Sequence, residues 1–250
     1  PEIELPGHSS AALAAYPELG CFDKAYKVQS TWGIFEDIFC PKEETFTFLE
    51  NVFDEVLELF PSEYIHVGGD EAPKKQWKES DIAQSVIKRE GLKDELELQS
   101  YFVQRIEKYL NSKGRQIIGW DEILEGGLAP SATVMSWREE KGGIAVKLKH
   151  DVIMTPWSTN YFDHYQADMA NEPLAIGFFT PLTQVYNYEP IPKELTEEEG
   201  KYVLGSQGNL WTEFIHSPEK IEYMVLPRMT ALSEVLWTPK ADKDWFSFWG

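Results

Sequence analysis

Residues 64–72 read YIHVGGDEA, which is a short apolar run followed by two glycines and two adjacent carboxylates. Residues 64–67 are typical of a buried strand, and the glycines that stop this strand leave room for the backbone to turn or for a ligand to approach. Asp70 and Glu71 are therefore expected at the carboxyl end of the strand. In α/β folds with parallel strands, binding and catalytic side chains gather at that end.

Outward from this stretch, helix-like and strand-like apolar spacing alternate along the chain. Apolar residues three and four positions apart predict helices over 43–60 and 95–112, the first ended by Pro61 and the second capped by Gly114. A short helix is expected near 143–150, and another from 218 to 237 with a break near Pro227. Further strands are expected to end at Leu5 and to cover 116–120, 133–137, 152–156 and 203–211. The polar, proline-punctuated stretch 161–200 predicts a long loop.

Strands that alternate with helices predict a parallel sheet with helical crossovers. A doubly wound sheet gathers its ligand groups at one switch point. Here, chemically active side chains follow every strand, which favours a (β/α)₈ barrel of the TIM type. Only six strands are found where a closed barrel has eight, and a barrel lacking two strands exposes sheet edges. We therefore expect residues 1–250 to be one catalytic domain, the carboxy-terminal three quarters of a barrel whose first strands precede Pro1.

The composition excludes some classes of partner. The chain has 23 basic and 42 acidic residues, a net charge of −19, and no basic cluster, so nucleic acid is not an expected partner. No run of about 18 apolar residues is present, so no membrane span is expected. Cys21 and Cys40 have no zinc-type spacing, and the sequence leaves open whether they pair or stay free. Nine Trp, eleven Tyr and fourteen Phe indicate core packing and, in part, sugar stacking.

The adjacent pair Asp70 and Glu71 has two interpretations. An Asp-Glu pair often caps a helix N-terminus and complements its dipole. Two carboxylates side by side at the mouth of a barrel repel each other, and such crowding tends to raise the pKa of one member of a pair, as a general acid requires. The preceding strand and glycines, and the tryptophans elsewhere, favour the catalytic interpretation.

Four segments occur in a fixed order along the chain: residues 2–8 (EIELPGH), 66–71 (HVGGDE), 119–122 (GWDE) and 210–213 (LWTE). Together they resemble the catalytic barrel of glycoside hydrolase family twenty, the β-N-acetylhexosaminidases. The resemblance covers essentially the whole chain. It is the ordered set that is specific, because any one segment alone is weak evidence.

The resemblance implies a retaining, substrate-assisted mechanism, in which the 2-acetamido oxygen of the sugar attacks the anomeric carbon and forms an oxazolinium. Glu71 would be the general acid and later the base. Asp70 would orient the acetamido group and stabilise its positive charge. Tyr161 would hold the acetamido carbonyl, and Asp163 would bind a sugar hydroxyl.

The same resemblance implies the walls of the sugar site. Trp120, Trp137 and Trp211 would enclose the terminal sugar, and Glu213 would bind its hydroxyls. His8 would support the hydrogen bonds of the acid. No metal and no cofactor is implied. A substrate-binding Arg and a further Asp of the family are expected ahead of Pro1, which leaves open whether residues 1–250 are active by themselves.

The function implied is removal of terminal β-linked GlcNAc or GalNAc from a glycan, outside the cytoplasm, in the periplasm, at the cell surface or after secretion. Two alternatives stay open. One is a sugar-binding relic that keeps the tryptophan pocket without turnover. The other is a conventional retaining glycosidase whose nucleophile is Glu122, Glu139 or Glu213.

Overall fold

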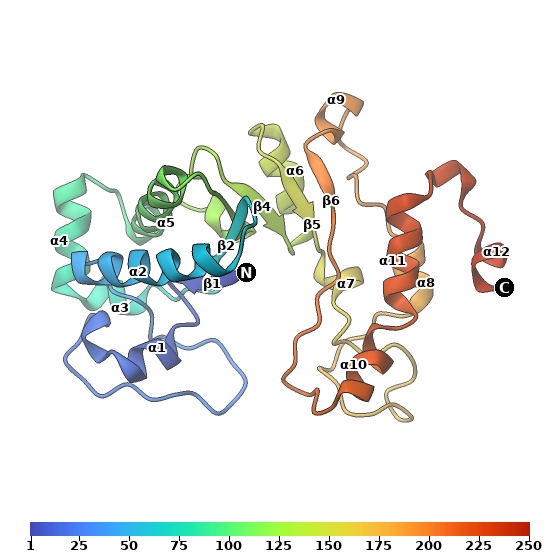
Figure 1. The fold of residues 1–250 in the computed structure, drawn as a ribbon, viewed down its shortest axis with the longest axis horizontal. Helices are drawn as coiled ribbons and strands as arrows, with labels where there is room; N and C mark the ends of the chain where they lie inside the picture. Colours follow the sequence, from blue (N-terminus) through green and yellow to red (C-terminus); the bar gives the residue numbers. More distant parts are fainter. The chain divides into compact units, whose positions relative to one another are not determined.

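The computed structural model describes residues 1–250, which form two compact units, Pro1–Val134 and Met135–Gly250. Both units are built from parallel strands and helices (Figure 1).

The amino-terminal unit holds three neighbouring parallel strands, and Leu5 lies opposite Gly68 while His66 lies opposite Ile118. The strands are β1 (Glu2–Leu5), β2 (Tyr64–Gly68) and β3 (Gln116–Trp120). The helices are α1 (Ser10–Ala15), α2 (Glu43–Leu59), α3 (Lys75–Glu79), α4 (Asp81–Glu90) and α5 (Glu95–Ser112), with short 3-10 turns η1 (Pro17–Leu19) and η2 (Asp121–Leu124).

Helix α5 shows how the sequence sets these elements. Asp94 caps its first turn by accepting hydrogen bonds from the backbone N–H groups of Leu96 and Glu97. Gly114 follows its end with φ +75°, a left-handed conformation that glycine adopts without strain. The buried side chains of α5 pack toward α2 and β3, and they are Leu98, Phe102, Val103, Ile106 and Leu110.

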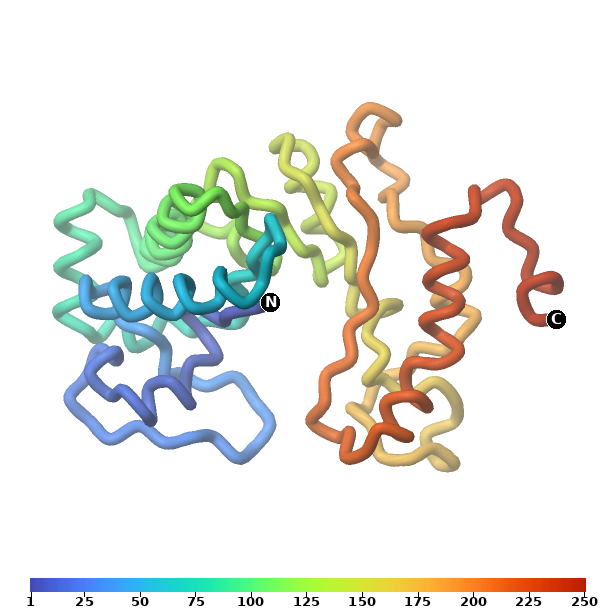
Figure 2. Tube along the Cα trace, viewed as in Figure 1, coloured from blue at the N-terminus to red at the C-terminus, as the bar shows by residue number.

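A long loop, residues 20–42, connects η1 to α2 and appears as the wide blue excursion in Figure 2. A disulfide between Cys21 and Cys40 closes this loop, which settles the pairing that the sequence left open. Lys75 contacts Glu36 at 2.9 Å, and Gln76 donates to Asp37 at 2.6 Å. The loop is therefore fixed both at its base and against α3.

The carboxy-terminal unit contains β5 (Val152–Met154) parallel to β6 (Val203–Ser206). The unit boundary falls within β4 (Thr133–Ser136), and the backbone N–H of Thr155 donates to the carbonyl of Ser136 at 2.8 Å. The helices are α6 (Glu139–Lys147), α7 (Trp157–Asn160), α8 (Leu182–Tyr186), α9 (Glu197–Gly200), α10 (Pro218–Val225), α11 (Arg228–Trp237) and α12 (Trp245–Trp249), with a 3-10 turn η3 (Lys240–Asp242). Its main core joins Phe162, Val185, Tyr186, Ala231 and Leu232.

The helices expected over 95–112 and near 43–60, the strands around 64–67 and 116–120, and the break near Pro227 are confirmed. The strands expected to reach residues 156 and 211 end at Met154 and Ser206, and the short helix begins at Glu139. The stretch 161–200 contains two short helices and is not entirely a loop. None of the helices is both long enough and apolar enough to cross a lipid bilayer.

Candidate active site

The turn after β2 places Asp70 and Glu71 at the carboxyl end of the strand, as the sequence predicted. Gly68 and Gly69 have φ values of +67° and +99°, which side chains with a Cβ rarely adopt. A Cβ on Gly68 would also overlap the carboxylate of Glu4, so this position needs glycine for space as well. Glu71 itself has φ +46°, a strained conformation for a residue other than glycine and one that is found often at functional sites.

His8 joins the two carboxylates. Its Nε2 lies 3.4 Å from Oδ2 of Asp70 and 3.4 Å from Oε2 of Glu71. Hydrogen bonds to Asp70 and Glu71 raise the pKa of His8 to about 10, although burial acts in the opposite direction. The imidazole is therefore a cation at neutral pH. It offsets the repulsion between the neighbouring carboxylates and fixes their orientation.

A second pair of carboxyl groups, those of Glu2 and Glu4 on β1, belongs to this cluster and was not identified from the sequence. Oε1 of Glu4 accepts a hydrogen bond from the backbone N–H of Gly69 at 3.1 Å. Burial and the negative charges of Asp70 and Glu2 raise the pKa of Glu4 to about 10. The alternation in residues 2–5 was the available signal, because side chains two apart on a strand share one face.

Glu2 connects this cluster to Trp120. Its Oε1 accepts from the indole Nε1 of Trp120 at 2.8 Å and lies 3.2 Å from Nδ1 of His66. Burial by itself would raise the pKa of Glu2, but the hydrogen bond and charge of His66, together with hydrogen bonds to Trp120 and Glu4, lower it below its usual value. The indole of Trp120 is 3% exposed and packs edge-on against His66, so most of this ring lies against protein atoms.

One atom of this cluster is poised for a ligand. Oδ1 of Asp70 is buried and makes no hydrogen bond within the protein. Such an acceptor favours a donor group on a bound molecule. The side chains of His8, Asp70 and Glu71 offer atoms within 4.8 Å of one another, a set that could hold a metal ion. A metal ion at this set would have to displace a proton from His8, whose pKa the two carboxylates raise to about 10.

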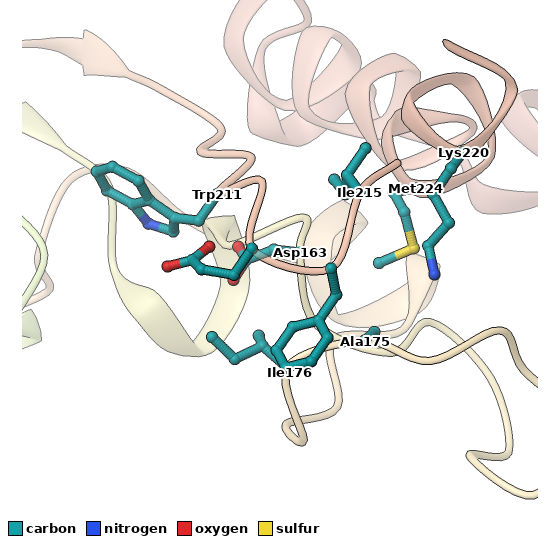
Figure 3. Close-up of a pocket in the computed structure, with 9 residues that line it drawn as sticks. Asp163, Ala175, Ile176, Trp211, Ile215, Lys220 and Met224 are labelled. Carbon is teal, nitrogen blue, oxygen red and sulfur yellow. The ribbon is translucent and has the colours of Figure 1, made fainter. Parts of the chain in front are cut away.

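A second group of expected residues lies together in the carboxy-terminal unit. The bridge between Tyr161 and Asn209 continues the pairing of β5 with β6, and the Tyr161 ring lies 6.3 Å from the Trp211 ring. A narrow hollow lies beside them, and Asp163, Trp211 and Glu213 line it (Figure 3). The structure therefore brings these four expected residues, Tyr161, Asp163, Trp211 and Glu213, into one neighbourhood.

Asp163 has unusual surroundings in this hollow. Its side chain is nearly buried, and its Oδ1 makes no hydrogen bond within the protein. Burial raises the pKa of Asp163 to about 7, and the charge of Glu213 adds to the rise. Glu213 is exposed, whereas Asp163 is buried. Together their carboxyl oxygens offer two hydrogen-bond acceptors suited to sugar hydroxyls.

Arg228, at the start of α11, holds the loop that carries Asp163, and nothing in the sequence singled it out. The guanidinium is fully buried and donates to the carbonyl of Phe162 and, at 3.0 Å, to that of His164. It also donates to the carbonyls of Thr180 and Met224. The residues on both sides of Asp163 are thus fixed by one side chain from a distant helix.

The remaining expected residues have less defined surroundings. Trp137 directly follows β4 and is partly buried, and its carbonyl accepts from the N–H of Trp157 at 3.0 Å. The guanidinium of Arg138 lies 5.8 Å from the Trp137 ring centre. Of the three alternative nucleophiles, Glu122 is buried, whereas Glu139 and Glu213 are exposed.

Comparisons with known proteins match nearly the whole chain. Residues 1–240 match the family model of glycosyl hydrolase family 20, catalytic domain. A β-hexosaminidase of Porphyromonas gingivalis is 54% identical over 99% of this chain and 32% of its own length. The chitobiase of Flavobacterium johnsoniae is 34% identical with a TM-score of 0.86, over 99% of this chain and 37% of its own.

An exo β-N-acetylglucosaminidase of Vibrio harveyi, solved in complex with N-acetylglucosamine, is 30% identical with a TM-score of 0.86. That match covers all of this chain and 40% of the Vibrio protein. The chain thus spans 32% to 40% of the length of these three proteins. The structural likeness confirms the expected fold class, a portion of a (β/α)₈ barrel. The family model and the relatives together show that the chain belongs to glycosyl hydrolase family 20 and matches the catalytic domain of that family.

Proposed function

We propose that the protein is an exo-acting β-N-acetylhexosaminidase that removes terminal β-linked GlcNAc or GalNAc from glycans with retention of configuration. The observation that carries the proposal is the cluster of Asp70, Glu71 and the imidazolium of His8 at the end of β2, in a chain of this family. Residues 1–250 are proposed to be the carboxy-terminal three quarters of the catalytic barrel.

The adjacency of Asp70 and Glu71 supports a substrate-assisted reaction. In a conventional retaining glycosidase, the acid and the nucleophile are two carboxyl groups about 5 Å or more apart that flank the sugar. Asp70 and Glu71 are adjacent in sequence, so we assign them different roles. Glu71 donates a proton to the glycosidic oxygen while the 2-acetamido oxygen attacks the anomeric carbon and the leaving sugar departs. Asp70 accepts from the acetamido N–H and stabilises the positive charge that develops there.

The second half of the reaction reverses the proton transfer. Glu71, now a carboxylate, takes a proton from water, and the oxygen of this water attacks the anomeric carbon and opens the oxazolinium ring. His8 keeps the side chains of Asp70 and Glu71 oriented through both steps. Tyr161 donates to the acetamido oxygen, and Asp163 and Glu213 accept from sugar hydroxyls. Trp137 and Trp211 present apolar ring surface to the sugar, and Trp120, which is 3% exposed, supports the wall of the site through its packing against His66.

The decisive test uses the full-length protein and p-nitrophenyl N-acetyl-β-glucosaminide. The wild type releases nitrophenol, Glu71→Gln loses at least about a hundredfold in kcat because the acid is gone, and Glu79→Gln on the exposed face of α3 keeps wild-type activity. A thiazoline analogue of the cyclic intermediate inhibits the wild type. Insensitivity to the thiazoline, together with a trapped covalent glycosyl-enzyme, would instead favour a nucleophile among Glu122, Glu139 and Glu213.

The sugar-binding relic predicts a different result. It binds GlcNAc in calorimetry and hydrolyses nothing.

We also propose that the protein works outside the cytoplasm. The disulfide between Cys21 and Cys40 supports this, because disulfides persist in oxidising compartments and are rare in the reducing cytosol. Fractionation of the native cells tests the location.

A further inference from the structure

A groove of about 270 Å³ in the amino-terminal unit begins at Glu71. Pro73 and Lys74 continue its wall from the same turn, and Glu125 and Ile34 face it from the end of η2 and from the loop 20–42. Pockets for drug-sized ligands start at about 300 Å³, so the space suits a smaller ligand such as a single sugar ring. Charged and amide side chains make up most of the lining, with apolar patches at Ile34 and Pro73.

The walls of this groove are held in place by hydrogen bonds. The amine of Lys74 donates to the carbonyl of Ala72 at 2.5 Å and to Oε1 of Gln99. Nε2 of Gln99 donates to the carbonyl of Gly69 at 2.7 Å. These contacts connect α5 to both ends of the turn that carries Glu71. A site already held in shape loses little entropy when a ligand binds.

The lip at Ile34 is also fixed. Ile34 is 54% exposed, and it lies in the loop closed by the disulfide between Cys21 and Cys40. The same loop is bound to α3 through Lys75 and Glu36. An exposed isoleucine on a fixed loop presents an apolar surface to whatever occupies the groove.

The position of the groove relative to the acid indicates its occupant. A general acid has to approach the glycosidic oxygen to hydrogen-bond distance. That oxygen leaves with the sugar on the far side of the scissile bond, so this sugar has to contact the neighbourhood of Glu71. If Glu71 is the acid, as proposed above, the groove that starts at Glu71 is in the right place for the leaving sugar.

The charges of the groove indicate which leaving sugars it accepts. Besides Glu71, which as the acid carries a proton when the substrate binds, two carboxylates, Glu122 and Glu125, line the groove against the single amine of Lys74. Burial lowers the pKa of Lys74 to about 8, which the negative charges of Glu125 and Glu122 oppose. A negative lining disfavours an anionic ligand and tolerates a neutral or cationic one.

We propose that this groove is the subsite for the leaving sugar and that it selects neutral or amino sugars over uronic acids. The proposal rests on the proposed function of Glu71. Ile34 and Pro73 contact the apolar face of the ring, while Lys74 and Glu125 offer hydrogen bonds to its hydroxyls.

The test compares three substrates of the full-length protein: N-acetylglucosaminyl fluoride, N,N′-diacetylchitobiose, and a disaccharide whose reducing sugar is a uronic acid. The fluoride has no leaving sugar and therefore cannot contact the groove. Its kcat/KM is the reference for binding of the terminal sugar and for the reaction itself. We expect the wild type to prefer the neutral disaccharide to the uronic acid disaccharide by about tenfold in kcat/KM, as repulsion by a partly solvated carboxylate predicts.

Two variants and one control test the residues. Glu125→Lys raises kcat/KM for the uronic acid disaccharide, relative to the fluoride, by about fivefold. Ile34→Ala lowers kcat/KM for both disaccharides, relative to the fluoride, by about threefold because apolar contact is lost. Glu79→Lys places the same charge on α3 outside the groove and leaves both ratios unchanged.

Each outcome decides one question. If the fluoride and both disaccharides are cleaved but neither variant changes a ratio, the leaving-sugar subsite is wrong and the proposed function stands. Equal cleavage of both disaccharides by the wild type overturns the charge selection. If the wild type cleaves none of the three substrates, the proposed function and the subsite fall together.

Discussion

Replacing Glu4 by Gln should stabilise the protein at neutral pH, although it removes a native carboxyl group. Burial, together with the negative charges of Asp70 and Glu2, raises the pKa of Glu4 from an ordinary value of 4.5 to about 10. Between these two pH values the folded protein keeps a proton on Glu4 and the unfolded chain does not. The folded state then binds more protons, so this group makes the free energy of unfolding fall as the pH rises.

The size of the effect follows from the same shift. Each pH unit above 4.5 costs the folded state about 1.4 kcal/mol, which amounts to about 3 kcal/mol at pH 7. A glutamine is neutral at every pH and avoids this cost. Its side-chain oxygen can still accept the hydrogen bond from Gly69, which the glutamate accepts at 3.1 Å. For a domain of this size, about 3 kcal/mol corresponds to a rise in Tm of about 6–12 °C.

The assay is thermal unfolding of the full-length protein and of Glu4→Gln between about pH 4 and about pH 9. The Tm difference should be near zero at the acidic end and grow steadily up to neutral pH. Glu55→Gln, on the exposed face of α2, is the matched control and should follow the wild type throughout. A constant Tm difference across the series, or a variant that is destabilised at neutral pH, would refute the assignment of the proton to Glu4.

Three further predictions concern the same clusters. Arg228→Met leaves buried carbonyls without their donor and should destabilise the protein by about 4 kcal/mol. Arg228→Lys should recover part of the lost Tm. Equal Tm values for Arg228→Met and the wild type would contradict the role of the guanidinium. Gly68→Ala should destabilise by at least about 2 kcal/mol, and Glu4→Ala in the same chain should relieve part of the loss, measured as a double-mutant cycle. With the pKa of Asp163 at about 7, KM for the sugar should rise as the pH falls through this value because the carboxylate acceptor gains a proton, and Asp163→Asn should remove this pH dependence from plots of log KM.

The elements that the sequence predicted best are those whose signals are local. Both ends of α5 lie at the predicted residues because Asp94 caps the helix and Gly114 follows it. Helices α3 and α4 were missed, since residues 75–90 are mostly polar and only a few side chains, such as Trp77, face the core.

Errors elsewhere came from tertiary contacts. The short helix was expected near 143–150, but α6 begins at Glu139 and runs through Gly142 and Gly143. A Cβ on Gly142 would lie 2.5 Å from the sulfur of Met154, so this glycine allows the helix to pack on β5. Contact between residues far apart in sequence is invisible to local periodicity.

In the site, too, residues with a local sequence signal were predicted and residues that depend on tertiary contacts were missed. Motif positions identified Asp70, Glu71 and His8, and the structure brings these three together at the end of β2. Glu4 and Arg228 were not identified, because a carboxylate on a strand and an arginine on a helix are ordinary in a sequence. Their importance comes from burial, which depends on the finished fold.

The guanidinium of Arg228 has a practical consequence for anyone who shortens this chain. It binds the backbone on both sides of Asp163 from the first turn of α11, more than sixty residues further along the chain. A truncated protein that stops after β6 would therefore lose more than a surface helix. The segment around Asp163 would be released from its arginine anchor, and affinity for sugar should disappear before the rest of the unit unfolds.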